Sequence, residues 1–421
     1  MSTNLSGGMN KPPDLERSPP MTTETALDQQ VSIHVLRSVE EDPHGWDAAA
    51  PADNLFLQRP YLRALEAHPP KGIQFRYAII RQGDMPLGVV YTQLLYFNGA
   101  ESIRYQQSSG RPACFFSTFG QFLRGLVARQ VGFYSLVCGN LMLSGEHGFA
   151  FQDDNCDHSA LVDQAMRQIR RSLEEENIPA SILLIKDFYP EHLETIDRFK
   201  DYQYHAFHIL PSMVMTLDPS WSSYADYLGA LSSKYRVRAK KARKVMSKDV
   251  QRRMLSLQDV HELQPQLHAL YQEIADDSGF NVITLDKHYF TQMKAALGDD
   301  FLVQGYFREG QLIGFLSGVI NLNGEFEAHF LGYANQWNPS YKLYLNMLLD
   351  LVELAIQHRS TSLIFARTAE EIKSSVGAKA VNLTCYIRHR SSFTNRFIRP
   401  LLDYLNPVDD WVPRHPFKQE D

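Results

Sequence analysis

The sequence predicts an α/β (α+β) protein with two related units in tandem, each a mixed, mostly antiparallel sheet flanked by helices. The chain has 421 residues, and single cores stop growing at roughly 250 to 300 residues. Two hairpins, at 75–97 and 301–322, each precede a strand, a helix and another strand. With 44% apolar and 21% charged residues, the composition is that of a globular protein.

The first unit is expected at residues 31–215, after an N-terminal tail. Residues 1–30 are rich in Pro, Ser, Thr and Gly and are predicted to be disordered, because they lack the apolar side chains of a core. Hydrophobic patterns then predict a strand at 31–38, a helix within 55–68, hairpin strands at 75–82 and 87–97, a buried strand at 131–143, a helix at 158–177 and a buried strand at 180–188. The last three form a parallel crossover.

The second unit is expected at residues 216–395. After a basic helix at 232–248, the patterns predict a hairpin at 301–322, a strand at 325–333, a helix at 339–358, a strand at 362–367, a short helix and a strand at 384–390. Asn323-Gly324 is a strong hairpin-turn signal before the strand at 325–333. Residues 396–421 are expected to form a C-terminal tail.

The basic helix contains eight Lys and Arg residues between positions 234 and 248, in a chain whose formal net charge is −6. Four of its apolar residues, Tyr235, Ala239, Ala242 and Met246, form one narrow stripe. The basic side chains either form a solvated face or bind a polyanion. Like charges at i,i+4 cost roughly 0.2 to 0.5 kcal/mol per pair, which favours an anionic partner. Lys234 and Arg236 are therefore candidate phosphate contacts.

The strand at 325–333 carries two candidate general bases. Alternation places Glu325, Glu327 and His329 on one face, with Phe326, Ala328 and Phe330 on the other. A carboxylate and an imidazole on one face could remove a proton from an amine nucleophile. The alternative is that this face is simply the solvent side of an antiparallel sheet.

The helix start at 338–342 is a candidate phosphate site. Asn338 fits an N-cap and Pro339 fits the first helical position. Ser340, Tyr341 and Lys342 leave the positive end of the helix dipole without an acidic residue, so Asn338, Ser340 and Lys342 could hold a phosphate. Many helices, however, lack an acidic first turn.

The segment ARTAEEIKSSVGAK has a structural and a functional interpretation. Thr368 and Glu371 match a capping box, and Gly377 fits a helix end. Arg367, at a strand end, and Lys373 could instead face a ligand.

Four widely spaced cysteines without a CxxC pair argue against a zinc site and a disulfide scaffold, so no metal is expected. No apolar run is long enough for a signal peptide or a membrane span. A cytoplasmic protein with reduced thiols is predicted. The sequence does not indicate an oligomeric state.

Several of these segments carry a family resemblance. The tandem organisation, the SSKYRVRAKKARK helix, CGNLMLSGEHGF, LIFARTAEEIKSSVGAKAVNLTCYIRHR and the closing RHPFK resemble tandem-domain GNAT-type acyltransferases of the branch related to Fem peptidyltransferases. The likeness spans roughly 31–417. Within this branch the chain is similar to bacterial GNAT-family and peptidoglycan-biosynthesis proteins.

The resemblance implies an amine or amino-acid-like acceptor that attacks an acyl-coenzyme A thioester or, in the Fem branch, an aminoacyl-tRNA ester. It places Glu327 or His329 as base, Tyr341 or Tyr344 near the leaving group, and the lysines and arginines on phosphates. ANQWNPSYK replaces the Gly-x-Gly phosphate loop of ordinary GNAT enzymes, which counts against standard coenzyme A binding. A non-catalytic polyanion-binding module is the third alternative.

Overall fold

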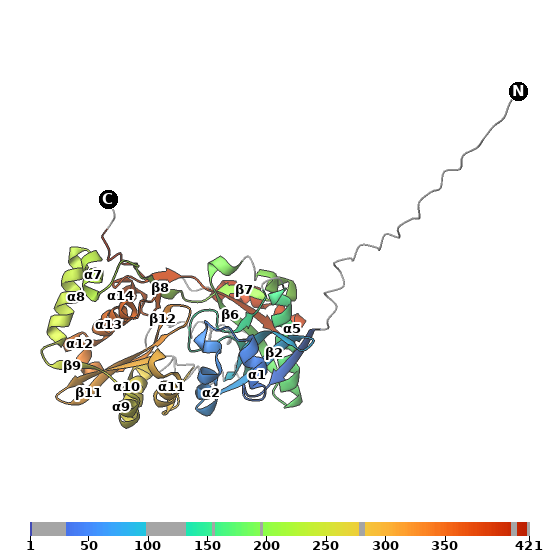
Figure 1. The fold of residues 1–421 in the computed structure, drawn as a ribbon, viewed down its shortest axis with the longest axis horizontal. Coiled ribbons are helices and arrows are strands. Elements are labelled where there is room, and N and C mark those ends of the chain that lie inside the picture. The colour runs from blue at the N-terminus through green and yellow to red at the C-terminus, as the bar shows by residue number, and fades with distance from the viewer. Residues whose placement is uncertain are drawn as a thin grey trace.

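Two β-sheets lie side by side along the long axis of the molecule (Figure 1). The computed structural model describes residue 1 and residues 31–97, 132–153, 156–193, 197–277, 283–405 and 411–418. The predicted tail at 2–30 lies outside these residues. The first sheet has the order β1-β2-β3-β4-β6-β15-β7, with β5 beside β3, and the second has the order β14-β8-β13-β12-β11-β10-β9.

The first sheet follows the predicted elements closely. Its strands are β1 (Val31–Leu36), β2 (Ile73–Gln82), β3 (Met85–Phe97), β4 (Phe133–Cys138), β5 (Phe149–Phe151), β6 (Ala180–Phe188), β7 (His205–His208) and β15 (Thr384–His389). The accompanying helices are α1 (Pro43–Ala49), η1 (Leu55–Leu57), α2 (Arg59–Ala67), α5 (His158–Glu175), η2 (Pro190–His192) and η3 (Asp197–Tyr202). β4 and β6 are parallel and α5 connects them, which confirms the predicted crossover.

The second sheet also contains its predicted hairpin and third strand. Its strands are β8 (Ser212–Thr216), β9 (Val250–Met254), β10 (Phe301–Arg308), β11 (Gln311–Ile320), β12 (Glu325–Tyr333), β13 (Ser362–Ile364) and β14 (Lys379–Val381). Its helices are α7 (Tyr224–Ala230), α8 (Ser233–Met246), α9 (Leu257–Glu262), α10 (Gln264–Asp277), α11 (Tyr289–Leu297), η4 (Gly298–Asp300), η5 (Asn335–Trp337), α12 (Asn338–Tyr341), α13 (Leu343–Gln357) and α14 (Glu370–Ser374). α15 (Ser392–Asn395) and α16 (Ile398–Leu405) follow β15.

The two sheets exchange strands. β8 lies between β13 and β14 in the second sheet, and β15 lies between β6 and β7 in the first. A division of the chain at residues 215 and 216 would assign most of β8 to the first unit and all of β15 to the second. Each strand instead occupies an interior position of the other sheet, so neither sheet is complete without the other half of the chain.

The predicted helix at 339–358 is interrupted at Lys342. This residue has φ 53° and ψ 44° and separates α12 from α13. The side-chain amide of Asn346 donates to the carbonyls of Tyr341 (2.9 Å) and Lys342 (3.2 Å), so the polar groups at the break have partners. The expectation of one continuous helix is therefore wrong.

A buried apolar cluster joins the two units. It includes Leu62 of α2, Tyr77 of β2, Phe290 of α11 and Phe301 of β10. α2 and α11 pack against each other at the junction, where Figure 1 shows them as neighbours. The two units therefore share this apolar cluster.

The basic helix α8 forms one outer edge of the second unit (Figure 1). Ala239, Ala242 and Met246 are buried and Tyr235 is partly buried, which confirms the predicted stripe. Arg243 reaches α13, where its guanidinium lies 2.5 Å from an Asp350 oxygen and 3.2 Å from a Glu353 oxygen. The local sequence contains no acidic partner for the basic residues, and the partners of Arg243 come from α13 instead. Among the described residues, the other seven basic side chains of the run have no carboxylate partner within salt-bridge distance.

Among the described residues, no helix combines the length and apolar composition needed to cross a bilayer. Among the same residues, no group of three or more His, Cys, Asp or Glu side chains is arranged to bind a metal ion.

Candidate active site

Glu327 lies where two parallel strands diverge. β12 pairs with β13 only from Glu325 to Glu327, whose register partner is Ile364, whereas β12 itself continues to Tyr333. The Glu327 side chain is buried, with 2% of the residue exposed. It therefore faces the interior between the two units, and the alternative of a solvent-facing position is wrong for this residue.

A β-bulge changes the side-chain alternation after Ala328. The register between β11 and β12 shifts between Leu316 and Gly318, and the Ser317 hydroxyl donates to the Phe330 carbonyl (2.6 Å) while accepting from its N–H (3.1 Å). An extra residue turns the side chains that follow it. Phe330 consequently packs on Tyr289 beside His329, and its predicted place on the opposite face is wrong.

The surroundings of Glu327 favour its protonated form. Burial raises the pKa of Glu327 well above its ordinary value, and the charge of Glu325 raises it further. The backbone N–H of Ser144 and the charges of Lys186 and Arg367 act in the opposite direction. The Oε1 atom is buried and has no hydrogen-bond partner among the described residues. A buried carboxyl group with a raised pKa and an unused oxygen is suited to accepting a proton.

His329 is less available than Glu327 as a base. Its Nε2 atom lies 2.5 Å from the Tyr289 hydroxyl. Burial lowers the pKa of His329 to about 3, so the imidazole is neutral near pH 7. Burial also raises the pKa of Tyr289, which keeps the phenol protonated as the donor to Nε2. The Nε2 atom of the predicted imidazole base thus already accepts a hydrogen bond from Tyr289.

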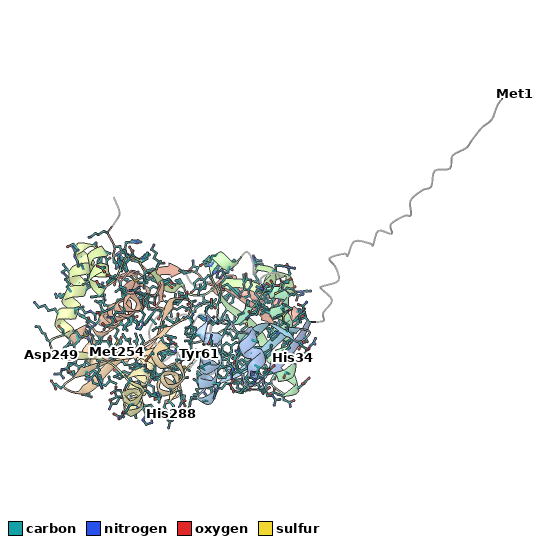
Figure 2. All side chains as sticks on the ribbon, viewed as in Figure 1. Met1, His34, Tyr61, Asp249, Met254 and His288 are labelled. Atoms are coloured by element: carbon teal, nitrogen blue, oxygen red, sulfur yellow. The ribbon has the colours of Figure 1, made fainter. Side chains whose placement is uncertain are left out.

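A chain of buried polar groups continues from Tyr289 into the first unit. Tyr289 and Tyr61 each influence the pKa of the other, and Tyr61 accepts a hydrogen bond from the Asn140 amide (2.8 Å). The Gln93 amide in turn lies 3.3 Å from the Asn140 oxygen. Figure 2 shows Tyr61 in the middle of the molecule, between the two units. Buried polar side chains therefore hold the two units in one relative position.

A charged cluster lies beside Glu327. Arg367 binds Asp187 through two contacts, Nη2 to Oδ1 at 2.5 Å and Nη1 to Oδ2 at 3.2 Å, and Lys186 forms an ion pair with the same carboxylate. Arg367 Nη1 also donates to the Ser144 hydroxyl (3.1 Å). The Ser144 N–H also lowers the pKa of Glu327, so Ser144 interacts with both the base candidate and the cluster.

Lys373 lies in a cage of backbone carbonyls. Its Nζ atom donates to the oxygens of Phe365 (2.7 Å), Ala366 (3.3 Å) and Arg367 (2.6 Å). Burial lowers the pKa of Lys373 to about 7, against the opposing charges of Glu370 and Glu327. Arg367 and Lys373 both lie close enough to Glu327 for an electrostatic interaction with its carboxyl group. Their predicted contact with a ligand stays a prediction.

The capping box predicted from Thr368 and Glu371 is wrong. α14 begins after Ala369 without a side-chain cap, and Thr368 has a φ of 68°. Glu371 forms an ion pair with Arg414 of the C-terminal segment instead. A positive φ at Thr368 places its hydroxyl outside the geometry that capping requires.

The residues at the start of the interrupted helix lie apart from Glu327. The Tyr341 hydroxyl is 3.0 Å from Arg308 Nε and 3.2 Å from Asp249. Asn338 Oδ1 accepts the Tyr344 N–H (3.1 Å), so this helix-start amide already has a partner. Tyr344, in the first turn of α13, is partly buried and packs beside Tyr333. No described contact links these tyrosines to Glu327 or His329, and their leaving-group role stays a prediction.

The remaining phosphate candidates lie on the surface. Ser340 and Lys342 are exposed. Lys234 lines a groove of about 620 Å³ together with Arg238 of α8, Trp411 and Arg414. Arg236 is half-buried on α8. The predicted residues thus form three separate groups, at β12 and β13, at the start of α12, and on α8.

Sequence reasoning missed Lys186, Asp187, Tyr289 and Tyr189. Lys186 and Asp187 interrupt the apolar run ASILLIKDF, and two adjacent charges inside a buried strand are a usable signal. Tyr189 lies near Glu325 and Glu327, whose charges add to the effect of burial in raising its pKa. Nothing in the local sequence indicates that Tyr189 or Tyr289 meets β12.

Comparison with solved structures identifies the fold. FemX superposes with a TM-score of 0.50 at 9% identity, over 84% of this chain and 96% of FemX. A tandem GNAT protein from the clavulanic acid biosynthesis pathway gives 0.46 at 10% identity, over 86% and 99% of the two chains. A GCN5-related N-acetyltransferase from Sphaerobacter thermophilus gives 0.41 at 11%, over 85% and 95%. No family model matches the sequence, and no curated protein matches it.

The chain folds as two tandem GNAT-like domains with mixed sheets flanked by helices, which confirms the predicted fold class. At 9% identity the likeness to FemX establishes the fold alone, so the chemistry has to be argued from the residues of this chain.

Proposed function

We propose that the chain is an acyltransferase that moves an acyl group from a coenzyme A thioester to an amine, with Glu327 as the general base. The observation that carries the proposal is the buried Glu327 carboxyl group, with its unused Oε1 atom, at the point where β12 and β13 diverge. The GNAT-like fold of the domain that contains it is consistent with this chemistry.

The reaction forms one C–N bond and breaks one C–S bond. The amine nitrogen attacks the acyl carbonyl carbon, Glu327 accepts the proton that the amine loses, and the sulfur leaves as coenzyme A thiolate, which takes up a proton. A general base works best when its pKa is near the working pH. The raised pKa of Glu327, caused mainly by burial, moves the carboxylate toward that range.

An aminoacyl-tRNA ester is the second candidate donor, and two observations favour it. The Tyr344 N–H is occupied by Asn338, and Lys342 interrupts the helix whose start would hold coenzyme A phosphates. Basic side chains on α8, by contrast, project from the outer edge of the unit, where an RNA backbone could reach them. In this reaction a C–O bond breaks and the tRNA hydroxyl leaves.

Thermal unfolding with three ligands distinguishes the donors. Acetyl-coenzyme A, alanyl-tRNA and uncharged tRNA are each added to the full chain, because a ligand that binds only the native state raises its melting temperature. A rise with acetyl-coenzyme A supports the first donor, and a larger rise with alanyl-tRNA than with uncharged tRNA supports the second. Equal rises with both tRNAs would indicate the non-catalytic polyanion-binding module, and no rise with any ligand would count against all three alternatives.

Once the donor is known, Glu327→Gln tests the base. Turnover with a panel of amino acids and amino sugars should fall by roughly 10² to 10⁴. Glu325→Gln, two residues earlier on the same strand, is the control and should retain far more activity. Turnover of the Glu327→Gln variant within twofold of the parent protein would remove Glu327 from the mechanism.

A further inference from the structure

Two phenylalanines are exposed side by side beyond the last strand of the first sheet. Phe393 of α15 is 71% exposed and Phe397, which precedes α16, is 58% exposed. Their ring centroids are 5.5 Å apart with an interplanar angle of 68°. Adjacent exposed aromatic side chains with no role in a core often mark an interaction surface.

Other residues attach this segment to the protein. Ile398 is fully buried in an apolar cluster on the first sheet that includes Ile387 and Leu184, and the partly buried Leu402 packs against this cluster. The attachment of α16 therefore does not use the two phenylalanines. Their exposure is a property of the surface and does not result from an incomplete core.

Basic residues line a pocket formed in part by the segment that carries the phenylalanine pair. This pocket of about 680 Å³ is lined by Lys200 of η3, His205 of β7, and Arg396 and Arg399. His205 and Arg399 line the same pocket, and burial and the charge of Arg399 lower the pKa of His205. Among the described residues, neither Arg396 nor Arg399 has a carboxylate within salt-bridge distance. The nearby Arg390 differs from them, because its guanidinium lies 4.0 Å from a Glu174 oxygen.

We propose that Phe393, Phe397, Lys200, Arg396 and Arg399 form a docking surface for a bilayer that contains anionic phospholipids. The phenylalanines would enter the boundary between headgroups and acyl chains, and the basic side chains would contact lipid phosphates, one of which fits the pocket. Aromatic residues flanked by Lys and Arg are the pattern of interfacial membrane binding.

The arrangement of the two rings favours a bilayer over a nucleic acid. Single-stranded nucleic acids stack their bases on open aromatic faces. In this pair one ring edge is directed toward the other ring, so the pair offers a compact apolar projection and no parallel stacking platform. The inference concerns binding alone and does not rest on the acyltransferase proposal.

Co-sedimentation with lipid vesicles tests the docking surface. The full chain is mixed with vesicles of phosphatidylcholine alone, and with vesicles in which about a quarter of the lipid is phosphatidylglycerol. We expect much stronger sedimentation with the anionic vesicles than with vesicles of phosphatidylcholine alone. Each Lys or Arg near such a surface contributes enough affinity that Arg396→Glu with Arg399→Glu should lower the partition coefficient by about tenfold or more.

The phenylalanines are tested separately from the charges. At about 1 M salt, where electrostatic attraction is screened beyond about 3 Å, we expect a residual bound fraction that Phe393→Ser with Phe397→Ser abolishes. Phe393→Ser alone is the second variant, because this more exposed side chain can be replaced with little effect on folding. Circular dichroism melting curves report whether each variant is folded.

A matched variant on α8 is the control. Lys240→Glu with Lys241→Glu changes the net charge by the same amount as the arginine pair, and Val237→Ser in the same variant removes a 60% exposed apolar side chain. We expect its partition coefficient to stay within about twofold of the parent value. Loss of binding in this variant but not in the Arg396 and Arg399 variant would overturn the proposal.

Two other outcomes would also overturn it. One is the absence of sedimentation of the parent protein with anionic vesicles. The other is that the Arg396 and Arg399 variant keeps vesicle binding but loses binding to tRNA in a filter assay, which would make the surface a nucleic-acid site.

Discussion

Asp187 and Arg367 form a buried two-contact ion pair between the two sheets, with nitrogen to oxygen distances of 2.5 and 3.2 Å. Asp187 belongs to β6 of the first sheet, and Arg367 follows β13 of the second. Lys186 binds the same carboxylate, and the Cys385 thiol of the exchanged strand β15 lies 3.3 Å from it. One carboxylate thus contacts groups from β6, from β15 and from the segment that follows β13.

Replacing Arg367 by Ala should destabilise the protein strongly. The substitution leaves Asp187 buried with Lys186 as its one remaining cationic partner in the described cluster, and breaking a buried pair typically costs about 3 to 5 kcal/mol. Urea denaturation measures the free energy of unfolding. Arg63→Ala is the control, because its pair with Glu40 is exposed and such pairs contribute roughly 0.2 to 1 kcal/mol. Similar losses in both variants would show that Arg367 does not stabilise the junction.

The exchanged strands should make both units unfold together. Each sheet has an interior strand from the other half of the chain, so loss of one unit removes a strand from the other. We expect superimposable guanidinium unfolding curves for two variants that keep one of the four tryptophans, either Trp46 in the first unit or Trp221 in the second. Two clearly separated midpoints would show that the units unfold independently despite the exchange.

His329 should make stability depend on pH in the acid range. Its pKa is lowered by burial to about 3 in the folded protein, against about 6.5 in an unfolded chain. Between these values the unfolded state binds more protons, so stability falls as the pH decreases from about 6.5 to about 3. In His329→Gln this slope should decrease by up to about 1.4 kcal/mol per pH unit. The exposed His261→Gln is the control, and an unchanged slope in His329→Gln would contradict the prediction.

Glu327→Gln should stabilise the folded protein at alkaline pH. Burial raises the pKa of Glu327 above that of an unfolded chain, so the folded state keeps its proton longer and stability falls as the pH rises through this interval. The amide has no charge to bury. The variant should gain at least about 1 kcal/mol relative to the parent between pH 4 and pH 8, because one pKa unit corresponds to about 1.4 kcal/mol.

Chemical denaturation at the two pH values measures this gain. Glu309→Gln, whose side chain is 76% exposed, should show no comparable pH-dependent change. A Glu327→Gln variant with the same relative stability at both pH values would mean that the folded state tolerates the buried charge without cost.

Local elements were predictable from the sequence because their signals are local. The hairpins, the α5 crossover and the stripe of α8 follow from periodicity and turn residues. The position of β15 does not, because TCYIRHR carries the same pattern whichever sheet it joins, and its partners Leu184 and Phe207 lie far away in the sequence. Long-range pairing therefore set the limit of the fold prediction.

The prediction of the candidate site was also limited by contacts between segments that lie far apart in the sequence. Glu327 and His329 were found because they share a strand, but their difference in availability depends on Tyr289, which is 40 residues distant from His329. The misplaced face of Phe330 depends on Ser317 of the neighbouring strand. A single segment cannot show which donor engages an imidazole or where a partner strand inserts a bulge.

Because β8 and β15 are exchanged, the first sheet cannot be completed until β15 has been synthesised. The gap between β6 and β7 cannot be filled until residue 389 has left the ribosome. The first half of the nascent chain must therefore wait with two open strand edges while the second half is translated. Such edges invite pairing with other chains, so the interval before release is the time at which this protein most needs chaperone protection.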